Sequence, residues 1–313
     1  MSEGLVAVDL GGSTARMALF ALDGATMLET ARLELGQETG PLQAISQVAS
    51  VIAGWEQGAQ TKIRGVVTGL AAVHDAAGTI VTWPNRPAWN GFAFRDTFAA
   101  MVGKPVALFD DANLAALGEY AFGLDYPVPH LLYTVVGTGI GSAFVWQGHV
   151  YAGARGASGE LGHMMVDPRG EKCPCGGFGC LQMYASGRAM ERIAQANGLP
   201  VVKASDVFRL ASAGNATAQA IVDDAMRMLA IGIANAVRLF DPDMVVVGGG
   251  MASRFPERYR LLETLVQEFL GTLPQRNVSV TLSNLGDDAA LWGGIAYGLQ
   301  WFAKNKETEG VRK

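Results

Sequence analysis

The hydrophobic positions of this chain follow two periods, and their alternation predicts a mixed α/β protein. Short apolar runs are typical of buried strands, and they occur at 5–8, 16–21, 63–70, 106–109, 131–136, 142–146, 244–247 and 278–282. Apolar residues at helical spacing predict helices at 41–55, 92–102, 114–122, 187–196, 216–240 and 289–302. Strands and helices therefore alternate along most of the chain, as in α/β units.

Two glycine-rich turns occupy corresponding places in the two halves. Gly11-Gly12-Ser13 follows the first strand and Asp9, and Gly137-Thr138-Gly139 lies between the runs at 131–136 and 142–146. Each stretch reads as strand, turn, strand, a hairpin whose tip exposes backbone N–H groups. No low-complexity linker separates the halves, and 313 residues favour two domains. Because no G-x-G-x-x-G turn opens a helix after the first strand, a dinucleotide-binding fold is disfavoured.

Composition narrows the class of protein. Hydrophobic residues make up 50% of the chain and charged residues 17%, which excludes a disordered chain. The net charge of −5 without a basic block disfavours a nucleic-acid partner. The stretch 131–154 has no charged residue and the length of a membrane span, but its glycines and the turn at 147–149 favour two strands. Without a targeting segment at the N-terminus, we expect a cytoplasmic protein with no membrane partner.

The cysteines of the chain predict a metal site. Cys173, Cys175 and Cys180 all fall within eight residues, and an odd, clustered set makes a poor disulfide framework. Thiolates at this spacing favour zinc, which prefers four tetrahedral ligands. His163 is the only one of the four histidines close upstream, so we expect a closed, structural Cys₃His zinc site. The alternative is a set of free buried cysteines beside an unrelated histidine.

Several motifs occur together in a fixed order. They are Asp9-Leu10-Gly11-Gly12-Ser13, Asp111-Ala112-Asn113, Gly137-Thr138-Gly139-Ile140-Gly141, Glu160-Leu161-Gly162-His163 with the cysteine knuckle, and Gly248-Gly249-Gly250. From Leu5 to about Gly298 the chain resembles the ROK family, within the actin/hexokinase/Hsp70 ATPase superfamily. The resemblance implies an actin-like (ribonuclease H-like) α/β fold of two domains with an interdomain cleft, a structural zinc knuckle, and a homodimer. We expect domains at 1–112 and 113–292, with a closing helix at about 293–313 that packs back on the first.

The resemblance also implies a role for each motif, with ATP and Mg²⁺ as the donor. Asp111 would be the general base that takes the proton of the attacking sugar hydroxyl. Asp9 would hold Mg²⁺. The nucleotide would be bound by Asp9, Gly11, Gly12, Ser13, Gly137, Thr138, Gly139, Gly248, Gly249 and Gly250. The sugar would be bound by Asn85, Asp110, Asn113, Glu160, His163 and Gln182.

Asp110 and Gln182 are among the residues that depart from the family's pattern. Asp110 stands where the family has Asn, and adjacent carboxylates raise one another's pKa. Gln182 stands where the family has a Glu that contacts the sugar. It either meets the sugar as an amide or packs beside the knuckle. In the alternative interpretations, Asp110 and Asp111 only cap the next helix, and Asn85 belongs to a rigid surface loop.

These features predict an ATP-dependent kinase that phosphorylates the 6-hydroxyl of a hexose, with glucose as the first choice. The alternative is a kinase for allose or for an N-acetylhexosamine (N-acetylglucosamine or N-acetylmannosamine). A sugar-sensing repressor is disfavoured because the first strand starts at Leu5, which leaves no room for an N-terminal DNA-binding motif. A non-catalytic sugar-binding protein is disfavoured because Asp9, Asp111 and the phosphate glycines are all present.

Overall fold

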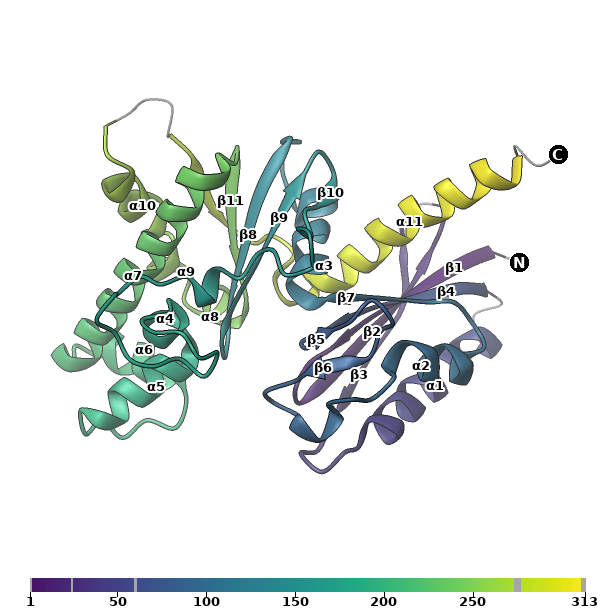
Figure 1. The fold of residues 1–313 in the computed structure, drawn as a ribbon, viewed down its shortest axis with the longest axis horizontal. Coiled ribbons are helices and arrows are strands. Elements are labelled where there is room, and N and C mark those ends of the chain that lie inside the picture. The colour runs from purple at the N-terminus through teal and green to yellow at the C-terminus, as the bar shows by residue number, and fades with distance from the viewer. Residues whose placement is uncertain (1, 24, 59–60, 273–276, 311–313) are drawn as a thin grey trace. The chain divides into compact units, whose positions relative to one another are not determined.

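The computed structural model describes residues 2–23, 25–58, 61–272 and 277–310, with side chains described up to residue 302. The chain divides into two compact units, which are coloured along the chain in Figure 1. Unit 1 contains Met1–Phe122 and Asp288–Lys313, and unit 2 contains Gly123–Asp287. The boundaries expected at 112 and 292 fall within helices α3 (Asp111–Gly118) and α11 (Ala289–Gly310), both of which belong to unit 1.

The sheet of unit 1 has the strand order β3-β2-β1-β4-β7. Its strands are β1 (Ser2–Leu10), β2 (Thr14–Ala21), β3 (Met27–Glu34), β4 (Thr61–Leu70) and β7 (Val106–Asp110). β1 and β2 form an antiparallel hairpin, whereas β4 and β7 run parallel to β1. The carboxyl ends of these three parallel strands therefore meet at one edge, where Asp9 pairs with Gly69 and Gly69 with Phe109.

Both faces of β1 are buried because helices cover both faces of the sheet. Val6, Val8 and Leu10 belong to a core cluster with residues of α1 (Pro41–Gly58) and α2 (Phe94–Val102). Leu5 and Ala7, which alternate with them, face α11. Glycines of α11 allow this close approach, since a Cβ at Gly294 would lie 2.6 Å from Ala7 Cβ and one at Gly298 2.4 Å from Leu5 Cδ2.

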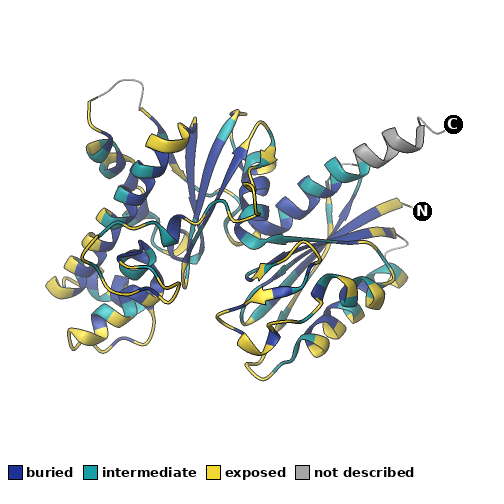
Figure 2. Ribbon diagram, in the orientation of Figure 1, coloured by how far each residue is buried: buried dark blue, intermediate teal, exposed yellow. Residues whose placement is uncertain are grey.

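Unit 2 repeats the strand order of unit 1, as β10-β9-β8-β11-β12. Its strands are β8 (His130–Val136), β9 (Ile140–Trp146), β10 (His149–Val150), β11 (Met244–Gly248) and β12 (Ser279–Leu282). Its helices are α4 (Gln182–Ala185), α5 (Gly187–Ala196), α6 (Ala204–Ser212), α7 (Ala216–Phe240), α8 (Gly250–Arg254), α9 (Pro256–Tyr259) and α10 (Leu262–Leu270). The buried positions of α7 and of the sheet stand out in Figure 2. In both units the glycine turn joins the first two strands of the sheet.

Several elements differ from the sequence expectation. The helix expected at 114–122 begins earlier, because the side chain of Asp110 caps α3 by accepting a hydrogen bond from the N–H of Ala112. The α-helix ends at Gly118, and a π-helical turn, Glu119–Gly123, follows it directly. The sequence expectation also lacked β3, α6 and the small hairpin of β5 (Val73–His74) and β6 (Ile80–Thr82).

The stretch 131–154 forms strands, as the glycine positions predicted. Of the described helices, none combines the length and the apolar composition that a membrane span needs.

The contact between α3 and α11 depends on glycine, which gives a first prediction. A Cβ at Gly293 would lie 1.7 Å from the carbonyl oxygen of Leu114. Gly293→Ala is therefore expected to lower the free energy of unfolding by about 3 kcal/mol, because the crowded helices must move apart. Gly54→Ala in α1 is the control, since a Cβ there meets no atom within 4 Å. It should instead stabilise by roughly 0.5–1 kcal/mol in urea unfolding. Equal stability of Gly293→Ala and the parent chain would contradict this packing.

Candidate active site

The first half of the candidate site lies at the carboxyl edge of the sheet of unit 1. Asp9 is near the end of β1, and the turn that follows is closed by the N–H of Gly11, which donates to the carbonyl of Thr14 at 2.9 Å. The Asp9 carboxylate accepts a hydrogen bond from Arg16 Nη2 at 2.6 Å. Arg16 Nη1 also lies 3.5 Å from the carboxylate of Asp288. The Asp9 carboxylate therefore lies beside the backbone of the turn and is paired with the guanidinium of Arg16.

Asp111 lies at the same edge, as the first residue of α3. Its Oδ1 accepts from the N–H of Ala112 at 2.8 Å. Burial, followed by the charges of Asp110 and then Asp9, raises the pKa of Asp111 to about 8. The adjacent carboxylates therefore affect each other as the sequence indicated. A carboxyl with this pKa exchanges its proton near neutral pH, which suits a general base.

Asn85 lies against the glycine turn. A Cβ built on Gly12 would be 3.2 Å from the Cβ of Asn85 and 3.5 Å from its Nδ2. The structure therefore brings Asn85 together with the turn that follows Asp9, although the two are more than seventy residues apart in the sequence. Asn113 lies two residues after Asp111 in the first turn of α3. Asp9, Asn85, Asp110, Asp111 and Asn113 all belong to unit 1.

The Cys₃His set predicted from the sequence comes together in unit 2. The ligand atoms of His163, Cys173, Cys175 and Cys180 all lie within 4.8 Å of one another. Cys175 Sγ is 3.7 Å from Cys180 Sγ, and Cys173 Sγ is 3.8 Å from His163 Nδ1. Zinc–sulfur bonds of about 2.3 Å at tetrahedral angles separate two sulfurs by roughly 3.8 Å, so the donor set fits Zn²⁺.

A glycine-dependent loop builds this cluster. The N–H of Cys173 donates to the carbonyl of Gly177 at 2.8 Å, and Met165 forms a β-bridge with Cys180. Gly179 has a φ of +58°, and a Cβ there would lie 1.7 Å from the carbonyl oxygen of Asp167. Only glycine fits this position, which explains part of the glycine excess around the cysteines.

Glu160 precedes a single 3₁₀ turn, Leu161–His163, that packs against the start of β9, and His163 is the last residue of that turn. A Cβ at Gly162 would lie 2.2 Å from the carbonyl oxygen of Ile140, so glycine permits this contact. His163 directs Nδ1 toward the cysteines, while its Nε2 lies 3.9 Å from Glu160 Oε2. One ring nitrogen is therefore placed for a metal and the other faces the Glu160 carboxylate.

Gln182 lies beside the cysteine cluster. Its Nε2 is 3.4 Å from Cys173 Sγ and 3.5 Å from His163 Nδ1. On its other side, a Cβ built on Gly139 would lie 3.5 Å from Gln182 Oε1. The amide thus connects the cluster with the second glycine turn. This is the packing beside the knuckle that the sequence left open, and a contact of Gln182 with the sugar stays a prediction.

The glycine turns of unit 2 leave room that other side chains would fill. Gly249 requires glycine for internal reasons, since its φ is +95° and a Cβ would lie 2.5 Å from the carbonyl oxygen of Val136. A Cβ at Gly137 or Gly250, in contrast, would meet no atom within 4 Å, and neither has a positive φ. Their lack of a side chain leaves open space beside backbone N–H groups, which fits the approach of phosphate or ribose oxygens. Gly248 ends β11, and Thr138 is exposed at the turn.

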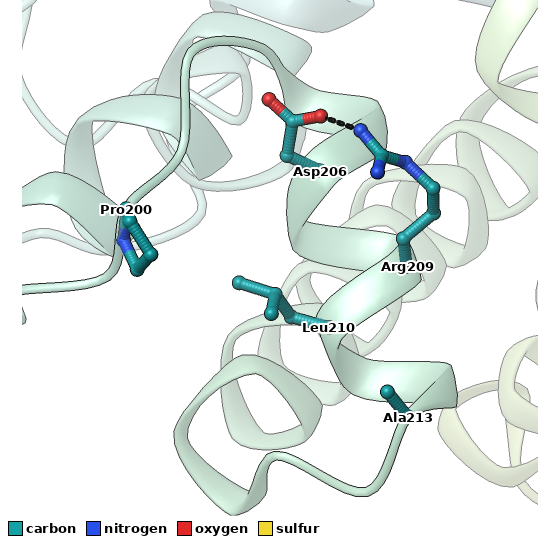
Figure 3. Close-up of a pocket in the computed structure, with 5 residues that line it drawn as sticks. All are labelled: Pro200, Asp206, Arg209, Leu210 and Ala213. Atoms are coloured by element: carbon teal, nitrogen blue, oxygen red, sulfur yellow. Dashed lines mark hydrogen bonds and ion pairs between the residues drawn. The ribbon is translucent and has the colours of Figure 1, made fainter.

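A surface pocket of about 430 Å³ lies elsewhere in unit 2, near α6. Its lining residues are Pro200, Asp206, Arg209, Leu210 and Ala213, and Figure 3 shows the ion pair between Asp206 and Arg209. None of them is a candidate site residue. The two charged side chains are paired with each other, so the pocket offers little to an ionic substrate.

Arg16 is a residue of this site that the sequence reasoning missed. It pairs with Asp9 across the β1–β2 hairpin, where the two are register partners. The turn through Gly11, Gly12 and Ser13 sets the register of this hairpin. The length of the turn could therefore have predicted that Arg16 lies opposite Asp9.

Two sheets of equal strand order, each opened by a glycine-turn hairpin, fit an actin-like fold of two domains. The chain belongs to the ROK family, whose model matches residues 5–300. A glucokinase of Thermotoga maritima is 31% identical over 93% of this chain and 96% of its own. An N-acetyl-D-glucosamine kinase of Aliivibrio salmonicida is 34% identical over 67% of this chain and 72% of its own. The crystal structure of a ROK hexokinase from Thermus thermophilus superimposes with a TM-score of 0.82, at 34% identity, and covers 94% of this chain and 97% of its own.

The cysteine cluster gives a second prediction. Protein purified without added zinc should contain about one zinc per chain, and Cys175→Ser should lose it and unfold at lower temperature, because structural zinc contributes folding free energy. His149→Ala, on the exposed β10, is the control and should keep its zinc. A parent chain that contains no zinc and unfolds at the same temperature as Cys175→Ser would refute the site.

Proposed function

We propose that this protein is an ATP-dependent sugar kinase that transfers the γ-phosphate to the 6-hydroxyl of a hexose, with glucose as the preferred sugar. One observation carries the proposal. Asp111, a carboxyl group with its pKa raised to about 8, lies at the same sheet edge as Asp9 and the glycine turn that follows it. The ROK membership and the glucokinase, hexokinase and N-acetylglucosamine kinase relatives support it.

The residues divide into groups with separate tasks. Asp111 accepts the proton of the attacking hydroxyl as that oxygen forms its bond to phosphorus. Asp9 would hold Mg²⁺, and a hydrated Mg²⁺ is commonly bound by one or two carboxylates. Bound Mg²⁺ neutralises charge on the phosphate oxygens. Gly11, Gly12 and Ser13 in unit 1, and the glycine turns of unit 2, would hold the nucleotide by backbone N–H groups.

The sugar would be read by side chains that both donate and accept hydrogen bonds. Asn85 and Asn113 in unit 1 offer amides, and Asp110 offers a carboxylate. In unit 2, Glu160 and the Nε2 of His163 lie together and suit a pair of neighbouring hydroxyls. Zinc bound through His163 Nδ1 would fix the orientation of that ring.

A kinase for an N-acetylhexosamine is the second candidate, and the N-acetyl-D-glucosamine kinase relative favours it. Cytoplasmic location and a homodimer stay predictions.

A coupled assay of ADP release over a panel of hexoses and N-acetylhexosamines tests the function. We expect glucose to give the highest kcat/KM, and Asp111→Asn to lower kcat by roughly 10²–10⁴-fold while sugar binding survives. A higher kcat/KM for an N-acetylhexosamine would establish the second candidate. Sugar binding without turnover of any member would instead indicate a sugar-sensing regulator.

The raised pKa of Asp111 gives a pH prediction. The base works only when ionised, so kcat/KM, measured with both substrates below saturation, should fall as the pH is lowered through about 8. Asp110→Asn removes a neighbouring negative charge, lowers the pKa of Asp111, and should move this acidic limb to lower pH. Asp23→Asn, on an exposed turn of the same unit, is the control and should leave the limb in place. An acidic limb that does not move in Asp110→Asn would contradict the electrostatic coupling.

A further inference from the structure

Arg86 is a buried cation that none of the roles above uses. It is 3% exposed, and its side chain donates to four backbone carbonyls. Nε donates to Gly12 at 2.9 Å, and Nη1 to Thr39 at 3.0 Å. Nη2 donates to Leu35 and to Gly36, both at 3.1 Å. One guanidinium therefore ties the glycine turn after Asp9 to the loop that follows β3.

The segment that carries Arg86 is itself fixed at both ends. The N–H of Arg86 donates to the carbonyl of Trp83, and the N–H of Trp89 donates to the carbonyl of Arg86, each at 2.9 Å. The Trp89 indole N–H donates to the carbonyl of Thr39 at 3.2 Å, and the guanidinium lies 5.2 Å from the centre of the Trp89 ring. Trp83 and Trp89 are both buried. The backbone position from which the Arg86 side chain extends is therefore fixed.

This arrangement determines where Asn85 lies. Asn85 immediately precedes Arg86, and its Cβ is close to the glycine turn, 3.2 Å from a Cβ built on Gly12. Arg86 Nε donates to the carbonyl of the same Gly12, so two adjacent residues contact one turn. The distance between Asn85 and the turn is therefore constrained by a side chain whose guanidinium is bound to backbone carbonyls.

Arginine is the residue type that this task requires. Its planar guanidinium has five N–H donors in a fixed geometry, whereas lysine offers one compact ammonium group. The carbonyl of Thr39 also accepts from the Trp89 indole, and that of Gly36 from the N–H of Thr39. An apolar side chain at position 86 would therefore cost the carbonyls of Gly12 and Leu35 their donor, and buried carbonyls without partners are costly. Burial lowers the pKa of Arg86 from its ordinary value, which reflects the cost of placing a cation there.

We propose that Arg86 is a positioning residue that holds the sugar-binding loop, through Asn85, against the phosphate turn at Gly12, so that the sugar site is formed before the sugar binds. The inference rests on the proposed function for the identity of the ligands. The bonds of Arg86 to the glycine turn and to the loop at 35–39 do not depend on it.

The test compares Arg86→Lys and Arg86→Gln with Ile52→Ala, which removes buried volume from α1 in the same core and takes away none of the hydrogen bonds of Arg86. We expect both Arg86 variants to raise the KM for the sugar at least tenfold while kcat changes less than threefold, the pattern of lost ground-state binding. Ile52→Ala should leave the sugar KM within twofold, although it lowers stability. Trp89→Phe, which removes the indole bond to Thr39 and part of the ring that packs on Trp83, should raise the sugar KM about threefold and serves if the Arg86 variants do not fold.

Amide hydrogen exchange of the ligand-free protein gives a readout that does not need a substrate. In Arg86→Lys, the amides of 11–13 and 35–39 should exchange at least tenfold faster than in the parent chain, and those of unit 2 should not change. Unchanged exchange in these segments overturns the proposal, and so does a sugar KM in Arg86→Lys equal to that of the parent or matched by Ile52→Ala. An inactive parent chain whose Arg86→Lys variant still shows the faster exchange would refute the sugar-kinase function and leave the positioning role standing.

Discussion

Parallel pairing of β1, β4 and β7 is the constraint on which the candidate chemistry of unit 1 depends. Because the three strands run in one direction, they bring Asp9, Gly69 and the Asp110–Asp111 pair to the same edge of the sheet. Gly69 gives α3 room at this edge, since a Cβ there would lie 3.2 Å from Leu114 Cδ1 and 3.4 Å from Asp111 Cα. Burial of Asp111, followed by repulsion from the carboxylates of Asp110 and Asp9, raises the pKa of Asp111.

Apolar packing in the rest of the unit offsets the free-energy cost of gathering these carboxyl groups. Apolar side chains of α1 and α2 cover one face of the sheet, and α11 covers the other through glycine contacts with β1 and α3. Unit 2 uses the same means for a different purpose. Gly162 and Gly179 let the backbone approach Ile140 and Asp167, and these contacts place His163 and the cysteines around one point. In both units, close backbone approach at glycine positions puts polar side chains where they would not gather by themselves.

Much of this could be predicted from the sequence, because the signals were local. Apolar runs and glycine turns gave both hairpins, and the cysteine spacing with one upstream histidine gave the four members of the cluster. β3 escaped prediction because it is an edge strand with mostly exposed, polar side chains. The start of α3 was predicted three residues late, since capping by Asp110 is a matter of side-chain geometry and leaves no apolar pattern.

The partners of Arg86 could not be predicted for a related reason. A charged side chain in a loop resembles any solvated residue until the tertiary fold supplies its acceptors. For Arg86 those acceptors are carbonyls some fifty to seventy residues earlier in the chain. The contacts of Gln182 stayed ambiguous because a sequence does not show which groups lie within reach of its side chain. In the folded unit it lies between the cysteine cluster and the second glycine turn.

The division of the chain has a consequence for its synthesis. Unit 2 is one continuous stretch, whereas unit 1 is assembled from an early segment and from α11, which the ribosome makes after unit 2. Until α11 emerges, the face of β1 that carries Leu5 and Ala7 has no helix to cover it. We expect unit 2 to complete its core during translation, and the first segment of unit 1 to wait with an exposed apolar sheet. In the cell, the period between those two events is when this chain would depend most on chaperones.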